Sequence, residues 1–416
     1  MKRFYLIPLL FLSILVGSCV LTTLADKDST PSLPVPSAQQ QTAASALSRE
    51  WVITAVGDIM MHDTQIKAGY DPKEDRYDYS SFYTYVKPFL DSADLTIGNL
   101  ETTLAGSKAG YSGYPRFNAP EILAANLKEA GFDILTTANN HCLDKGQDGL
   151  ISTLDFLDQA GLQHTGTFRS PEERAGILQA DVKGLQVAVL SYTYGTNGLT
   201  TAKGHAYSVN YLEPESIKSD INKARESGAQ LIIAALHFGI EYQPSPNKAQ
   251  QQLAQSLLDA GADIILGQHP HVLQPAFFYQ KGSAGNKKFV IYSMGNFISD
   301  QKGLERRSSI LLNLHIGTDP ANQKPYLKKV TYLPVFTHKY KENGKTRFEV
   351  LPVEPALTSI NTGSVSHLSA GDLAQLEDSW RHTTACLSST DPDLQLMKVP
   401  IPLHGLTNIR DIKGEW

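Results

Sequence analysis

The sequence predicts an α/β fold to which β-hairpins are added late in the chain. From residue 51 to residue 297, strand-like segments alternate with helix-like segments, as in layered α/β proteins. Beyond residue 308, apolar segments flank Asn343-Gly344, a dipeptide that is typical of tight hairpin turns. The chain has 416 residues, which is enough for one large domain or two.

Each predicted strand is a short apolar run, and each predicted helix repeats apolar residues every three or four positions. The predicted strands are Trp51–Val56, Asp94–Gly98, Phe132–Thr137, Leu162–Thr165, Leu185–Tyr192, Leu231–Leu236, Ile264–Leu266, Phe289–Ser293, Ser309–Ile316, Leu327–Phe336 and Arg347–Val353. The predicted helices are Tyr77–Asp91, Pro120–Ala130, Ile151–Ala160, Glu215–Glu226, Lys248–Ala260 and Leu373–Trp380. Glycines follow four of these helices, where a helix commonly ends: Gly131, Gly161, Gly228 and Gly261.

Side chains that can bind metals gather just after several predicted strands. They are Asp58, Asn99, Glu101, Asn140, His141, His237, His269 and His271. In open α/β sheets, ligands bind beyond the carboxyl ends of the strands. Pro270 separates His269 from His271 and favours an extended backbone before it. Because residues i and i+2 of an extended chain project to one side, we expect both imidazoles to converge.

This set of donors suits divalent transition metals. Carboxylates, an amide oxygen and imidazoles bind Zn²⁺, Mn²⁺ or Fe, and there are more donors than one tetrahedral ion needs. We therefore predict two ions. His141 is predicted to act as a general acid or electrostatic stabiliser, with Asp144 orienting its ring. The predicted pocket residues are His62, Asn99, Glu241, Tyr242 and Asn296. Asn139 and Asn296 also suit loop bracing, and His62 suits a plain surface position.

The N-terminus predicts export. Lys2 and Arg3 precede an apolar run, and a small-residue segment ends at Cys19, which together form a signal peptide over residues 1–19. This segment resembles a bacterial lipobox, which implies lipidation of Cys19 and anchoring on the extracytoplasmic side of the membrane. An uncleaved membrane span is the alternative, although the run is short for one. Residues 20–48 are rich in Ser, Thr, Gln and Pro and are predicted to form a disordered tether.

The charge and the cysteines of the chain bear on nucleic-acid binding and on disulfide bonds. The formal charge is −5 and no basic stripe appears, so nucleic-acid binding is not expected. Cys142 and Cys386 are predicted to be free thiols. We expect the folded domain to cover residues 49–355, followed by a C-terminal extension, residues 356–416, of unknown role.

Six motifs resemble those of one protein family. They are V-G-D-I-M at Asp58, I-G-N-L-E at Glu101, T-A-N-N-H-C-L-D at His141, L-H-F-G-I-E-Y at His237, G-Q-H-P-H at His269 and His271, and Y-S-M-G-N-F at Asn296. In this order they resemble the CapA-type capsule-synthesis proteins, which are linked to poly-γ-glutamate and are similar in fold to calcineurin-like metallophosphoesterases. The resemblance covers about residues 51–297.

The resemblance implies a four-layer αββα sandwich with a metal site at the strand ends. It implies metal ligation by Asp58, Glu101, Asn140, His237, His269 and His271, and it matches His141 to the histidine that follows the ligand asparagine in metallophosphoesterases. Two positions depart from the phosphoesterase pattern. Met60 replaces a histidine of the first motif, and Asn99-x-Glu101 replaces the second motif, which carries an aspartate. These departures leave the identity and number of the ions open.

Three functions are consistent with the sequence. The first is a membrane-tethered, metal-dependent hydrolase or transferase of capsule biosynthesis or export, acting on polyglutamate, an isopeptide bond or an envelope phosphoester. The second is a non-catalytic accessory protein that binds the anionic polymer together with other capsule-synthesis membrane proteins. The third is a metal-independent, epimerase-like enzyme. Polymer binding would need local basic residues, for which Lys108, Arg116, Lys145, Arg306 and Arg307 are candidates.

Overall fold

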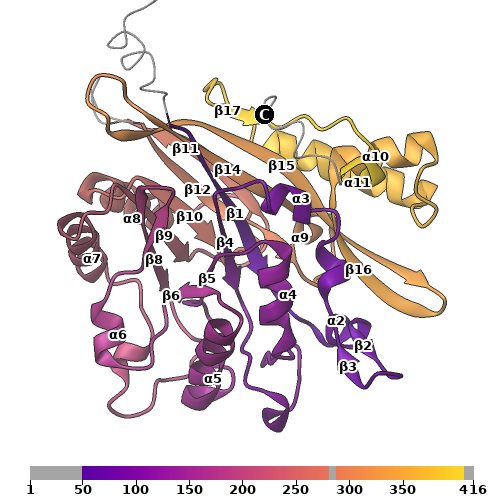
Figure 1. The fold of residues 1–416 in the computed structure, drawn as a ribbon, viewed down its shortest axis with the longest axis horizontal. Coiled ribbons are helices and arrows are strands. Elements are labelled where there is room, and N and C mark those ends of the chain that lie inside the picture. Colours follow the sequence, from indigo (N-terminus) through magenta and orange to yellow (C-terminus); the bar gives the residue numbers. More distant parts are fainter. Residues whose placement is uncertain (1–48, 281–286, 407–416) are drawn as a thin grey trace, which may run out of the picture. The chain divides into compact units, whose positions relative to one another are not determined.

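Two β-sheets, stacked face to face, form the centre of the protein (Figure 1). A computed structural model describes residues 49–280 and 287–406, and all statements on structure concern these residues. The predicted signal peptide, its Cys19 and the tether lie outside them. None of the helices formed by the described residues is both long enough and apolar enough to cross a membrane.

The first sheet places four parallel strands beside a set of antiparallel ones. Its strands are β1 (Trp51–Ile59), β4 (Leu95–Leu100), β5 (Ile134–Thr136), β6 (Gln163–Thr165), β13 (Asn296–Ile298), β14 (Ser308–Thr318), β15 (Pro325–Glu342), β16 (Lys345–Pro352) and β17 (Leu394–Leu396). The strand order is β16-β15-β14-β1-β4-β5-β6, with β13 paired to β1 and β17 to β15. Strands β1, β4, β5 and β6 are parallel, so their carboxyl ends meet at one edge.

The second sheet repeats this arrangement with four parallel strands of its own. Its strands are β7 (Gln179–Val182), β8 (Leu185–Thr193), β9 (Leu231–His237), β10 (Ile264–Gln268), β11 (Leu273–Tyr279) and β12 (Lys288–Met294). The order is β11-β12-β10-β9-β8-β7, in which β8, β9, β10 and β12 are parallel. A separate small hairpin pairs β2 (Tyr70–Asp71) with β3 (Arg76–Tyr77).

Helices cover the outer faces of both sheets. The α-helices are α2 (Asp63–Ala68), α3 (Lys87–Leu90), α4 (Ile122–Ala130), α5 (Gly146–Gln159), α6 (Pro171–Ala175), α7 (Pro214–Glu226), α8 (Lys248–Ala260), α9 (Leu304–Arg307), α10 (Val353–Thr362) and α11 (Ala370–Cys386). Short 3₁₀ turns are η1 (Ser80–Tyr83), η2 (Ser107–Ala109) and η3 (Ala206–Ser208).

Buried apolar side chains define four layers. One core lies between the sheets and includes Ile53 of β1 and Ile264 of β10. A second core joins the smaller sheet to α7 and α8, for example through Ile221. A third core joins the larger sheet to α4, α10 and α11, for example through Leu123 and Leu376. The predicted αββα arrangement is therefore confirmed, and Figure 1 shows α7 and α8 beside the smaller sheet and α10 and α11 beside β15.

Several predicted elements differ from those observed. The predicted helix Tyr77–Asp91 is wrong: the segment forms strand β3, η1 and the single turn α3 instead. Pro88 lies in this segment, and α3 begins just before it, where a proline is tolerated. Strand β11 follows directly after the His-Pro-His motif and was not predicted. The hairpin at Asn343-Gly344 is confirmed, with φ of 51° and 78° at its two central residues.

The C-terminal segment packs on the larger sheet. Helix α10 starts directly after β16, α11 extends the predicted Leu373–Trp380 helix at both ends, and β17 adds a parallel strand to β15. Buried Leu376, Met397 and Leu403 belong to the same core as the helices of the N-terminal half. Cys142 and Cys386 are free thiols, as predicted.

Candidate metal centre

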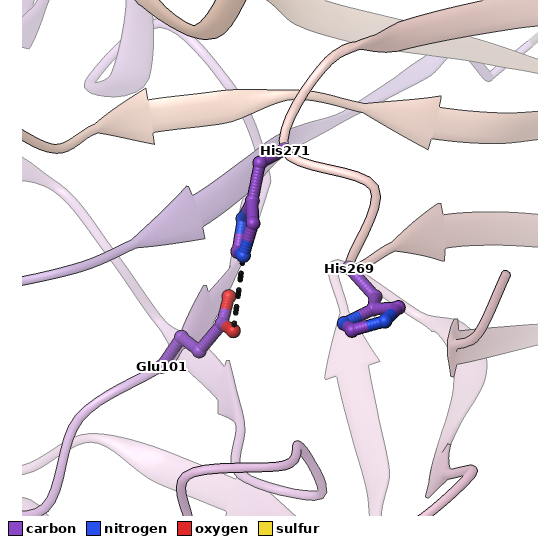
Figure 2. Close-up of side chains that lie close together, drawn as sticks. All are labelled: Glu101, His269 and His271. Carbon is purple, nitrogen blue, oxygen red and sulfur yellow. Dashed lines mark ion pairs between the residues drawn. The ribbon is translucent and has the colours of Figure 1, made fainter. Parts of the chain in front are cut away.

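The carboxyl ends of parallel strands from both sheets meet at one polar cluster. Asp58 lies near the end of β1, Asn99 near the end of β4 and His237 at the end of β9. Glu101 follows β4, and His269 and His271 follow β10. Figure 2 shows the Glu101 carboxylate and the His271 imidazole pointing toward one another, with the His269 ring beside them. The structure thus brings together residues that are as far apart in the chain as 58 and 271.

Asp58 connects the two sheets within this cluster. One of its carboxylate oxygens, Oδ1, accepts a hydrogen bond from Asn99 Nδ2 at 2.8 Å. The other, Oδ2, lies 3.1 Å from His271 Nδ1 and accepts from the His269 backbone N–H at 3.3 Å. The pairing of β1 with β4 and β13 shifts register beside Asp58, and such irregularities often redirect a side chain next to a site.

Glu101 is fully buried, and neither of its carboxylate oxygens has a hydrogen-bond partner. Its Oε1 lies 3.5 Å from His237 Nε2 and 3.8 Å from His271 Nε2. Burial raises its pKa well above the usual value, and the neighbouring Asp58 carboxylate raises the pKa further. A buried carboxylate without a donor is costly, so this position favours a bound cation.

The imidazoles of His237 and His269 are suited to metal ligation because burial favours their neutral form. Burial and, to a smaller extent, the neighbouring His271 together lower the pKa of His269 to about 3. Burial likewise places the pKa of His237 well below its usual value. The rings of His237 and His269 lie 4.8 Å apart, and His269 Nδ1 has no hydrogen-bond partner. Neutral imidazole nitrogens with free lone pairs are the form that binds metals.

The backbone at His269 and His271 differs from the extended conformation that was predicted. Their φ angles are +97° and +59°, in the region that residues with a Cβ rarely adopt. The prediction of convergence is nevertheless confirmed, because the two ring centroids are 6.0 Å apart around the Glu101 carboxylate. The left-handed turns, rather than alternation along a strand, direct both rings to this point. Strained residues of this kind cluster at functional sites.

The loop after β5 contributes an asparagine and a histidine. Asn140 Oδ1 lies 2.9 Å from His237 Nε2, and Asn140 Nδ2 donates to Asn197 Oδ1 at 3.2 Å. The adjacent His141 ring is positioned by Asp144, whose Oδ2 lies 2.7 Å from His141 Nδ1. Asp144 Oδ2 also accepts from the Phe117 N–H at 2.7 Å, which fixes the carboxylate. Asp144 therefore orients the His141 ring, as predicted from the sequence.

The predicted pocket residues fall into two groups. Asn99 and Asn296 are buried within the cluster, where Asn296 Oδ1 lies 3.0 Å from His271 Nδ1. Asn296 also donates to Arg306 O at 2.9 Å and so braces a loop. Glu241 and Tyr242 are exposed, and the Tyr242 ring lies 6.0 Å from His271 and 4.7 Å from the Arg306 guanidinium.

His62 is half-buried rather than a free surface residue. Its ring meets Phe117 edge-on at 5.1 Å, and Phe117 in turn meets His141 at 4.6 Å. Its Nδ1 accepts from the Asp300 N–H at 3.3 Å, and together with Gln65 it forms a capping box at the start of α2. Burial lowers the pKa of His62. His62 thus supports the loops beside His141.

Sequence reasoning missed two residues of this site. The Tyr194 ring, 47% exposed, lies 4.5 Å from the His269 ring and stacks on His237. Gln268 is buried with neither side-chain oxygen nor nitrogen bonded. Tyr194 directly follows the parallel strand β8, and this position could have marked it in the sequence as a residue of the site. Gln268 precedes the His-Pro-His motif, but a lone glutamine carries no chemical signal of its own.

The donors fall into two overlapping groups. Glu101, His269 and His271 offer atoms within 4.8 Å of one another, and so do Asp58, Glu101 and His237. Glu101 belongs to both groups, and neither of its carboxylate oxygens has a hydrogen-bond partner. Mixed carboxylate and imidazole donors suit Zn²⁺, Mn²⁺ or Fe, so the residues present fit divalent ions. The number and identity of the ions stay a prediction.

Comparison with known proteins agrees with the motifs. The profile of the family described as "Bacterial capsule synthesis protein PGA_cap" matches residues 52–301. A capsule biosynthesis protein CapA of Bacillus anthracis is 33% identical over 64% of this chain and 63% of its own length. A PGA biosynthesis protein CapA of Bacillus subtilis is 31% identical over 72% of this chain and 70% of its own length.

Two solved structures are similar over much of the chain. A calcineurin-like phosphoesterase from Bacillus subtilis is 14% identical, with a TM-score of 0.41 over 81% of this chain and 98% of that one. An NAD nucleotidase from Haemophilus influenzae is 12% identical, with a TM-score of 0.42 over 88% of this chain and 60% of that one.

Proposed function

Because the chain belongs to the bacterial capsule synthesis family PGA_cap, we propose that it is an extracytoplasmic metalloprotein of capsule biosynthesis or export. Its strand-end cluster would hold two divalent ions and act as a hydrolase or transferase site. The single observation that supports this most strongly is Glu101, which is buried, unbonded and common to both donor groups. A carboxylate shared between two sets of donors suits a site that holds two metal ions close together.

Each donor would take a defined place. One ion would be held by His269, His271 and Glu101. The other ion would be held by Asp58, His237 and Glu101. Asn140, 2.9 Å from His237, would complete the second set with its amide oxygen. Bound divalent ions would supply Lewis-acid polarisation and lower the pKa of a nearby water molecule.

The protein's own residues would handle binding and proton transfer. Asp144 holds Nδ1 of His141, which leaves Nε2 of that ring to deliver or accept a proton at the substrate. Tyr194 and Tyr242 are exposed beside the histidines and would contact substrate at the rim. Arg306, stacked on Tyr242, would supply positive charge to an anionic chain.

The named relatives suggest the substrate class. They are described as proteins of capsule and of PGA biosynthesis. We propose an anionic envelope polymer such as poly-γ-glutamate, or another envelope substrate, reached from a lipid anchor at Cys19. Other membrane proteins of capsule synthesis would be partners. The second candidate is an accessory function in which the chain binds polymer without catalysis. It is favoured by Arg306, Tyr194 and Tyr242, which could bind a polymer at the rim without any catalytic step.

Metal content and turnover test the proposal on the full chain. We expect about two transition-metal ions per chain at this centre, measured by elemental analysis as the metal that Glu101→Gln and His269→Asn lose relative to wild type. His141→Asn should keep the metal and the fold but reduce hydrolysis of polyglutamate or model phosphoesters by about 10²–10⁴-fold. Absence of metal after reconstitution with Mn²⁺ and Zn²⁺ would overturn the assignment of the centre.

A matched control separates catalysis from binding. His164 on β6 is paired with the exposed Asp158 of α5 at 3.1 Å and belongs to neither donor group, so His164→Asn should change neither metal content nor turnover. If the metal-loaded wild type binds polymer but turns over none of the substrates, and His141→Asn binds it equally well, the accessory function replaces the catalytic one.

A further inference from the structure

A second cluster of metal-binding side chains lies outside the region that the family profile matches. His338 on β15 and Glu349 on β16 face each other as directly paired residues of the hairpin. His367 comes from the segment between α10 and α11, and Asp372 comes from the first turn of α11. Three separate stretches of the C-terminal region therefore meet at one point.

The distances in this cluster require a cation. Glu349 Oε1 lies 2.8 Å from both His338 Nδ1 and His367 Nε2. His338 Nε2 lies 3.0 Å from Asp372 Oδ1. Each nitrogen of His338 thus faces a carboxylate, but a neutral imidazole can donate from only one of them. A proton or a metal ion must occupy the other position.

The arrangement of Asp372 favours a metal ion. A histidine that binds a metal almost always donates its other N–H to a carboxylate or carbonyl, which fixes the ring. Asp372 is in turn held by the Ser369 hydroxyl at 2.6 Å and the Ser369 N–H at 2.8 Å. With Nε2 of His338 donating to Asp372, the lone pair of Nδ1 points to Glu349 and His367.

The three inner donors match a zinc site in type and surroundings. Two imidazoles and one carboxylate are zinc ligands, and this set of three is found in zinc sites whose fourth position is taken by water or substrate. The side chains of His338 and Glu349 are buried, and His367 is 22% exposed. The Tyr340 ring covers both imidazoles, with centroids 5.0 Å and 4.8 Å away. Donors around a tetrahedral zinc lie about 3.3 Å apart at bond lengths of about 2.0–2.1 Å, so the cluster would open only slightly.

We infer that His338, Glu349 and His367 form a second divalent-metal site of the zinc class, with Asp372 as the residue that positions His338. The ion would tie the segment between α10 and α11 to the β15–β16 hairpin. This inference is independent of the strand-end centre, because the two sets of donors share no residue.

Zinc titration of the full chain, followed by hydrogen exchange, tests it. After chelation and return of Zn²⁺, wild type should hold one zinc more per chain than His367→Asn. Zinc should slow amide exchange over residues 363–373 in wild type and leave it unchanged in His367→Asn. Asp372→Asn should weaken zinc affinity about 10-fold or more, as loss of an orienting partner does. His367 is the variant of choice because it lies on a loop and is only partly buried.

Two further variants make the result specific. Glu101→Gln, at the strand-end centre, should keep the zinc-dependent protection of residues 363–373, and His164→Asn should behave as wild type. Equal zinc content in wild type and His367→Asn, or exchange over residues 363–373 that does not respond to zinc, would overturn the inference. Protons alone would then bridge these groups.

Discussion

Glu101 is a residue that should destabilise the metal-free protein and stabilise the protein with metal bound. Its carboxylate is fully buried beside Asp58, and no group donates to it. Burial and the neighbouring negative charge raise its pKa well above the usual value. A cation would offset both effects, so metal binding and folding stability should be coupled at this residue.

Glu101→Gln should therefore change stability in opposite directions with and without metal. In chelator, we expect the variant to be more stable than wild type by about 1–3 kcal/mol, because a neutral amide removes repulsion from Asp58. In saturating metal, wild type should be the more stable of the two. Urea unfolding in both conditions measures this, and a loss of stability in chelator would contradict the explanation.

His315 predicts a pH dependence of stability that is separate from either cluster. Burial and, to a smaller extent, the nearby Lys329 lower its pKa from 6.5 to about 4, against an opposing effect of Glu50. Below pH 6.5 the unfolded chain gains a proton that the folded chain does not. The stability due to neutral His315 is thus complete above that pH and is lost as pH falls toward 4.

The expected loss over this interval is about 1–3 kcal/mol. His315→Gln should show a correspondingly flatter stability profile between pH 7 and pH 4, because glutamine does not titrate. Glutamine can still donate to Thr331, the present partner at 3.0 Å, so the contact is kept. Chemical unfolding at several pH values measures this. Parallel profiles for the two proteins would exclude His315 as the cause.

At the site, residue types were predictable from the sequence, but backbone geometry was not. The motifs around Asp58, Glu101, His237 and the two following histidines indicated one cluster, and the structure assembles it. The positive φ angles of His269 and His271 could not be foreseen, because proline favours an extended residue before it. Contacts with the opposite sheet, such as the His269 N–H with Asp58, hold this turn.

Among the elements, β1 approaches Gly295, the residue between β12 and β13, and β10 approaches β12, in both places closely enough to require glycine. A Cβ at Gly57 would lie 1.8 Å from the Gly295 carbonyl oxygen, and a Cβ at Gly267 would lie 2.0 Å from the Tyr292 carbonyl oxygen. Both contacts involve backbone atoms, which cannot move aside easily. These two glycines therefore set the spacing of β1, which carries Asp58, and of β10, which precedes His269.

Gly57→Ala should consequently destabilise the protein by about 2–4 kcal/mol and reduce metal binding at the strand-end centre. A Cβ at Gly405 meets no atom within 4 Å, so Gly405→Ala is the matched control and should change neither property. Thermal unfolding and elemental analysis compare the two variants. A Gly57→Ala protein with normal stability would refute the close approach.

Strands and helices were predictable where their pattern was local. Helix α8 matches its prediction at both ends, because apolar spacing and a following glycine define it. Tyr77–Asp91 has helical spacing of aromatic residues, but these pack in a core shared with β16 and β13 instead. Strand β11 was missed because its partner β12 lies beyond an intervening segment, and such pairing leaves no local signal.

At the scale of the molecule, the C-terminal segment is part of the main core. Leu376 of α11 is fully buried with Leu123 of α4 and Phe336 of β15 in one cluster. The sequence of this segment gave no indication of this packing, because its apolar residues are interspersed with polar ones. The larger sheet therefore depends on the segment after residue 355 to cover its outer face.

Leu376→Ala should destabilise the whole protein by about 2–5 kcal/mol, as expected for a large side chain removed from a core. Glu377→Ala, at the next and exposed position of the same helix, should have little effect. A single unfolding transition shifted in Leu376→Ala would indicate one cooperative unit. A small effect confined to α11 would instead indicate an independently stable extension.

Strand β1 runs from one end of the sheet to the other, and its two ends have different surroundings. Trp51 pairs with Ile316 at its start, and Asp58 lies in the candidate metal centre at its finish. At about 3.3 Å per residue, its nine residues span roughly 25–30 Å. A substrate of the candidate metal centre would therefore have to approach the end of β1 that lies away from Trp51.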